Sequence, residues 1–164
     1  MVVYHGSNVE VREPRIIKPN RTLYFGNGFY TTTNHDQAAD FASRVTFNRN
    51  SGIATVNVFD VNESLAFDMC NGLRFPGVVD AWLDFVADNR LGIYAGPEYD
   101  LVFGPVANDD VYETLQLYVN GAISRAYTME RLKVKELFNQ LVCKTDKALA
   151  FLRFIRAEVL DERG

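Results

Sequence analysis

Short apolar segments bounded by glycine and polar residues predict the strands of this chain. Four segments have this composition: residues 2–4, 23–30, 53–61 and 138–144. Gly6 is expected to end the first strand. Gly26 and Gly28 interrupt the second, which is typical of a strand whose backbone bends or is approached closely.

Other segments repeat their apolar residues at helical spacing. Four helices are predicted: one capped by Asn34 and extending through Val45, and three more over residues 78–86, 111–119 and 128–137. Gln37 lies three residues after Asn34, the spacing of a capping box, and Gly121 suits the end of the third helix. After Thr145 the pattern allows either a terminal helix or a turn followed by a strand. Strands early and late with helices between them predict the α+β class.

Composition places the chain among folded globular proteins. Its 164 residues, 48% hydrophobic and 23% charged, suit one domain over residues 1–164. The first residues lack the pattern of a signal peptide, and no apolar run reaches the ~18 residues of a membrane span. Cys70 and Cys143 lie far apart and lack metal-ligand spacing, so reduced thiols, no metal and a cytoplasmic location are expected.

The net charge of −4 is concentrated in the middle of the chain. Residues 51–116 contain only two basic residues, Arg74 and Arg90, against eleven acids: Asp60, Glu63, Asp68, Asp80, Asp84, Asp88, Glu98, Asp100, Asp109, Asp110 and Glu113. Such a balance argues against a broad surface for duplex nucleic acid.

Three short segments carry the candidate chemistry. They are Tyr-His-Gly-Ser at residues 4–7, Gly-Asn-Gly-Phe-Tyr at residues 26–30 and Asn-Gln-Leu-Val at residues 139–142. In this order and at these separations the chain resembles the poly(ADP-ribose) polymerase branch of the ADP-ribosyltransferases. It is also similar to an uncharacterised bacterial family related to them. The resemblance implies a split β-sheet core with flanking helices, and NAD as the substrate.

The same resemblance assigns roles to individual residues. Tyr30 and Phe41 are expected to hold the flat nicotinamide ring between two aromatic faces, an arrangement that adds about 0.5–1.5 kcal/mol for each stacked contact. His5 is expected to bond a ribose hydroxyl of the adenosine half. Gly6 would offer its backbone N–H and C=O to the carboxamide, with Ser7 completing the NAD-binding motif. His5 and Tyr30 also count as catalytic residues.

Three positions depart from the family pattern. Gln140 stands where the family has a catalytic glutamate, and a glutamine keeps the hydrogen bond to the ribose but supplies no charge. Ala38 replaces a serine that bonds the carboxamide, and Asn27 replaces a lysine. The resemblance, with these departures, therefore implies transfer of single ADP-ribose units rather than polymer synthesis.

Three acids are candidates to replace the missing carboxylate. Asp109 and Asp110 precede an apolar helical pattern, so the simpler interpretation is a helix start with an acidic first turn. Asp100 is the third candidate.

Several functions fit these residues. The first is a mono-ADP-ribosyltransferase acting on an acceptor that is a protein, a nucleic acid or a small molecule; toxin-like bacterial relatives imply a neutralising partner protein. Hydrolysis of NAD is a related activity. The alternatives are a weak or inactive module that binds NAD or ADP-ribose, and a globular domain in which Tyr30, Phe41 and His5 only pack.

Overall fold

The computed structural model describes residues 1–16, 23–105, 109–134 and 137–160. Within these ranges the protein is α+β, with one mixed seven-stranded sheet and six helices. In chain order the elements are β1 (Val2–Ser7), β2 (Phe29–Thr32), α1 (His35–Arg49), β3 (Thr55–Val61), α2 (Glu63–Met69), β4 (Gly72–Arg74), α3 (Asp80–Leu91), β5 (Leu101–Pro105), α4 (Asp109–Val119), α5 (Arg125–Lys133), β6 (Asn139–Cys143), α6 (Asp146–Leu149) and β7 (Leu152–Val159).

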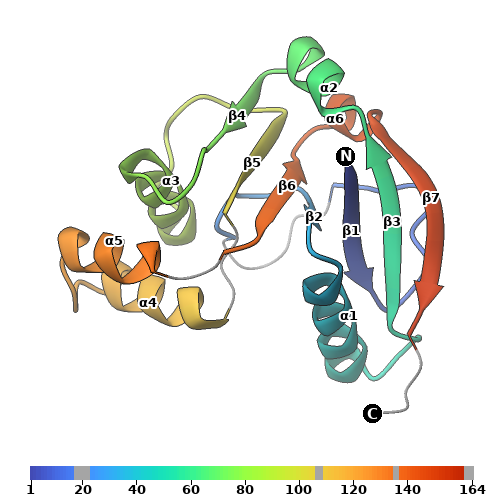
Figure 1. Ribbon diagram of the computed structural model, residues 1–164, viewed down its shortest axis with the longest axis horizontal. Coiled ribbons are helices and arrows are strands. Elements are labelled where there is room, and N and C mark those ends of the chain that lie inside the picture. Colours follow the sequence, from blue (N-terminus) through green and yellow to red (C-terminus); the bar gives the residue numbers. More distant parts are fainter. Residues whose placement is uncertain (17–22, 106–108, 135–136, 161–164) are drawn as a thin grey trace.

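The sheet is nearly divided at its centre. Its strand order is β4-β5-β6-β2-β1-β3-β7, and every neighbouring pair is antiparallel except β4 with β5. All of β1 is in register with β3, and all of β2 with β6, whereas β1 and β2 share the single pair Tyr4 and Thr32. We call this junction the split. Figure 1 shows the two halves of the sheet diverging on either side of it.

Different helices cover the two halves on one face. Helix α1 packs on β1 and β3, while α3, α4 and α5 gather beside β5 and β6 (Figure 1). The α1 contact is close, because a Cβ atom on Gly6 would lie 2.2 Å from the carbonyl oxygen of Ala38 and 2.9 Å from the nitrogen of Ala42. The opposite face buries Phe29 and Phe59 in one cluster, and Phe67 of α2 packs against that cluster.

Most predicted elements are present, with altered boundaries. The first strand continues through Gly6 to Ser7, so the glycine does not end it. The second strand begins only at Phe29, because the preceding segment is a turn in which the nitrogen of Gly26 donates to the oxygen of Leu23 and Gly26 has a φ of 79°. The predicted helix over residues 128–137 begins instead at Arg125, where the Ser124 side chain caps it, and ends at Lys133.

The remaining boundaries shift less, and three elements were not predicted. The strands predicted over 53–61 and 138–144 are Thr55–Val61 and Asn139–Cys143, and the helices over 78–86 and 111–119 are Asp80–Leu91 and Asp109–Val119. After Thr145 the second alternative is confirmed, because the one-turn helix α6 is followed by strand β7 and no terminal helix forms in the described residues. The unpredicted elements are α2, β4 and β5, which are short and lack a sustained period in sequence.

Candidate functional site

The split brings the beginning and the end of the chain together. His5 lies on β1, Tyr30 on β2 and Gln140 on β6, and these three strands are consecutive neighbours in the sheet. Side chains alternate between the two faces of a strand. Tyr30 and Gln140 share the face covered by α1, whereas the His5 side chain projects from the opposite face and reaches the backbone of Tyr30.

The backbone of Gly6 points into the split. Met1 and Val61 exchange two backbone hydrogen bonds. In an antiparallel ladder such pairs alternate with pairs that share no hydrogen bond, so every second residue of β1 after Met1, including His5, bonds its backbone to β3. Gly6 therefore directs its N–H and C=O toward β2. Tyr30 is the residue opposite it, but no strand pair forms there.

The imidazole of His5 fills part of this gap. Its Nδ1 lies 2.7 Å from the carbonyl oxygen of Tyr30, and its ring stacks on Phe29 with centroids 4.1 Å apart. A carbonyl only accepts, so Nδ1 carries the hydrogen, and Nε2 of the neutral ring is an acceptor. Burial lowers the pKa of His5 below its ordinary 6.5, and the bond to Tyr30 raises it by less, which keeps the ring neutral near pH 7.

Hydrogen bonds fix the ring of Tyr30. Its hydroxyl donates to the carbonyl oxygen of Gly26 at 2.5 Å and accepts from the nitrogen of Phe25 at 3.2 Å. Burial raises the pKa of Tyr30, so the phenol stays protonated. The ammonium of Lys144 holds the same turn, with Nζ 2.6 Å from the oxygen of Phe25 and 3.2 Å from that of Asn27. Sequence reasoning did not find Lys144, because only the tertiary structure brings it to the glycine-rich turn.

Gln140 is the most unusual polar residue of the site. It is only 5% exposed, yet within the described residues its side-chain amide makes no hydrogen bond. It lies in register with Thr32 of β2 and Gly104 of β5. The fully buried side-chain atoms without a partner in the described residues are Tyr24 Oη and Gln116 Nε2, and no atom of Gln140 is among them. The Gln140 amide therefore keeps some access to solvent and is available to bond a ligand.

The other residues singled out from the motifs lie nearby. Phe41 is 43% exposed on α1, and Ala38, one turn earlier, is buried against the sheet. Tyr30 and Phe41 are not in ring contact in the described structure, so the two rings are not paired with each other. The hydroxyl of Ser7 accepts from the nitrogen of Val9 at 3.4 Å, and the residue is 7% exposed, so it serves the turn after β1.

Asp100 does not replace the missing glutamate beside Gln140. Asp100 lies four residues along β5 from Gly104, the partner of Gln140, a separation of roughly 13 Å at ~3.3 Å per residue. Its carboxylate instead accepts from the nitrogen of Asn71 and the hydroxyl of Thr145. Helix α4 begins at Asp109, as the helix-start interpretation predicts, but the side chains of Asp109 and Asp110 lie outside the described part.

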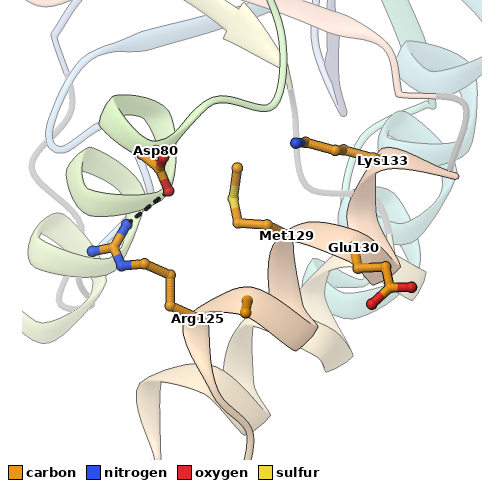
Figure 2. Close-up of a pocket in the computed structure, with 6 residues that line it drawn as sticks. Asp80, Arg125, Met129, Glu130 and Lys133 are labelled. Carbon is orange, nitrogen blue, oxygen red and sulfur yellow. Dashed lines mark hydrogen bonds and ion pairs between the residues drawn. The ribbon is translucent and has the colours of Figure 1, made fainter.

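A surface hollow of about 470 Å³ lies elsewhere, between α3 and α5 (Figure 2). Arg125 spans it with ion pairs to Asp80, at 3.3 Å, and to Asp84. Its other lining residues include Met129, Glu130 and Lys133. None of these residues belongs to β1, β2 or β6, so the hollow is separate from the candidate site.

In the described residues no three His, Cys, Asp or Glu side chains cluster to hold a metal.

Comparison with known proteins places the chain in one family. The model of a protein family of unknown function, DUF3990, matches residues 1–154. The chain belongs to this family. The matched region contains all three motifs and the three strands β1, β2 and β6 at the split. Neither the curated proteins nor the solved structures compared with the chain contain a match. None of the helices in the described ranges is long and apolar enough to cross a membrane.

Proposed function

We propose that this DUF3990 protein binds NAD across the split and transfers ADP-ribose from it to an acceptor, as a mono-ADP-ribosyltransferase. The observation that carries the proposal is that His5, Gly6, Tyr30 and Gln140 lie on three neighbouring strands, two of which, β1 and β2, separate after one residue pair. A split sheet with these residues at its centre is what the resemblance to ADP-ribosyltransferases implies.

Each half of NAD has suitable partners. In the proposed complex the Nε2 of His5 accepts from a hydroxyl of the adenosine ribose, since Nδ1 is already engaged. The N–H and C=O of Gly6 bond the carboxamide, whose acceptor and donor complement them. The ring of Tyr30, held by its own hydroxyl, stacks on the nicotinamide, and exposed Phe41 closes the other side.

Gln140 sets the chemistry of bond cleavage. The nicotinamide–ribose bond breaks through an oxocarbenium-like state, which a carboxylate stabilises by charge and a neutral amide does not. Gln140 holds the ribose 2'-hydroxyl and leaves the reaction slow, so polymer synthesis is not expected. We place the protein in the reducing cytoplasm, which suits the free, buried thiols of Cys70 and Cys143.

The neutral Gln140 also supports a second candidate, a module that binds NAD or ADP-ribose without cleaving it. Two measurements separate the candidates. Calorimetry with NAD and a nicotinamide-release assay both respond if the protein is an enzyme, whereas binding without release identifies a module. If millimolar NAD neither binds nor raises the melting temperature, both candidates are wrong, because a ligand of the folded state must stabilise it.

The variant Gln140→Glu tests the assigned role directly. One preorganised electrostatic contact to a transition state is worth about 10²–10³ in rate, so we expect nicotinamide release to increase roughly tenfold or more. The increase should grow with pH, because a carboxyl at this buried position ionises only above its ordinary pKa. The matched control is Gln116→Glu, the same change at a half-buried position on α4. Equal rates in wild type and both variants would contradict the role given to Gln140.

A further inference from the structure

Two more polar side chains lie beside Gln140. Thr32 and Gln140 are opposite each other on β2 and β6. The nitrogen of Thr33 donates to the oxygen of Asn139, so these two residues form a hydrogen-bonded pair. The neighbouring pair, Thr32 and Gln140, is therefore a non-hydrogen-bonded pair, the kind in which side chains lie closest together. Thr32 therefore presents its hydroxyl to the same space as the Gln140 amide.

Thr32 in turn fixes Gln37, in the first turn of α1. The Thr32 hydroxyl accepts from the nitrogen of Asn34 at 3.1 Å and donates to Oε1 of Gln37 at 2.5 Å. The expected capping box is thus only half formed: Asn34 accepts from the nitrogen of Gln37, but the Gln37 side chain bonds Thr32 instead of returning to Asn34. With its oxygen engaged, Gln37 directs its NH₂ group away from Thr32, and that group makes no hydrogen bond within the described residues.

The surroundings show that these three side chains interrupt an apolar face. On one side lies the core around Val102 and Val142, and on the other the core of Val56 and Val58 with Ala38. Gln37, Thr32 and Gln140 lie between them and carry no charge. The amide of buried Gln140 and the NH₂ of half-buried Gln37 therefore face the same place without a protein partner among the described residues, and both can bond a ligand there.

We propose that Gln37 is a further binding residue of the site, with its NH₂ donating to the uncharged nicotinamide-riboside half of NAD next to Gln140. Thr32 acts as a positioning residue that orients the Gln37 amide. The inference rests on the proposed function and adds to it a neutral donor set for the ribose hydroxyls and the carboxamide.

The experiment is calorimetry of NAD and AMP on wild type and four variants. Gln37→Met removes the donor while keeping the length of the side chain. A net hydrogen bond of about 0.5–1.5 kcal/mol corresponds to NAD binding weakened about 2- to 12-fold. AMP lacks the second ribose and the nicotinamide, so its affinity should not change. Asn48→Met, at an exposed position on the same helix, should bind both ligands like wild type.

Thr32 supplies the test of positioning. Thr32→Val should weaken NAD binding as Gln37→Met does, and Thr32→Ser, which retains the hydroxyl, should restore it. The melting temperature of each variant checks that it folds. We expect Gln37→Met to fold, because the Thr32 hydroxyl keeps a second acceptor, the oxygen of Asn139 at 3.4 Å. If wild type binds NAD and Gln37→Met binds it equally well, this inference is overturned and the proposed function stands. If wild type does not bind NAD, both are overturned.

Discussion

Replacing Gly6 with alanine tests which constraint requires a glycine on β1. The resemblance to ADP-ribosyltransferases explains the glycine by the approach of a ligand, while the structure shows α1 occupying the space where a side chain would stand. An added Cβ would meet two backbone atoms of α1, the oxygen of Ala38 at 2.2 Å and the nitrogen of Ala42 at 2.9 Å. Real Cβ atoms essentially never show contacts under 3.0 Å, so the helix must move.

The expected cost follows from this overlap. Inserting an atom into a packed region costs typically about 1–3 kcal/mol, and for a chain of this size each kcal/mol lowers the melting temperature by about 2–4 °C. Gly6→Ala should therefore melt about 2–12 °C below wild type in the absence of NAD. The measurements are calorimetry and urea unfolding followed by circular dichroism.

The matched control is Gly77→Ala, because nothing lies within 4 Å of a Cβ at Gly77. Ordinary surface substitutions change the free energy of unfolding by less than ~0.5 kcal/mol. If the free energies of unfolding of Gly6→Ala and of this control differ by no more than that, the packing argument is wrong. A stable Gly6→Ala protein with weakened NAD binding would favour ligand approach as the only constraint.

Two further predictions concern His5 and Tyr30. The folded pKa of His5 is lowered, so as the pH falls below 6.5 the unfolded chain takes up a proton that the folded ring refuses, and stability decreases until the folded pKa is passed. Urea unfolding at about pH 7.5 and about pH 5.5 should show this decrease in the free energy of unfolding, and His5→Gln should lessen it. The same dependence of stability on pH in wild type and in His5→Gln would contradict the burial of the ring. Tyr30→Phe removes both bonds to the turn before β2, costs about 1–3 kcal/mol and speeds hydrogen exchange at the Phe25 amide. Tyr127→Phe on α5, half exposed, is its control and should change neither.

The sequence determined the elements whose cause is local. The α1 helix was predictable because Asn34 caps it by accepting from the nitrogen of Gln37, and because small apolar residues recur on one side. The β-branched run of β3 and the alternation in β6 likewise act within a few residues. Strand β5 could not be predicted in this way, because its five residues are stabilised by pairing with β4 and β6 and not by a pattern of their own.

Motif residues could be named from the sequence, but their surroundings could not. Tyr30 was found by its glycine-rich context, whereas the hydrogen bonds that hold its ring, and the Lys144 ammonium that holds the turn, involve groups up to 119 residues apart. Gln37 was assigned to a capping box by its spacing. The competing partner, Thr32, wins because β2 ends where α1 begins and places its hydroxyl between the Asn34 nitrogen and the Gln37 oxygen.

What the sequence alone determined is therefore the α+β class, most helices and strands, and the identity of His5, Tyr30 and Gln140 as candidates. The tertiary structure decided that β6 inserts beside β2, that β1 and β2 separate after one residue pair, and that Gln140 is buried without a partner among the described residues. The physical reason is the distance along the chain over which each interaction acts. Helix caps and side-chain periods act over a few residues, whereas strand order and the satisfaction of buried polar groups depend on contacts between distant segments, which form only when the whole sheet assembles.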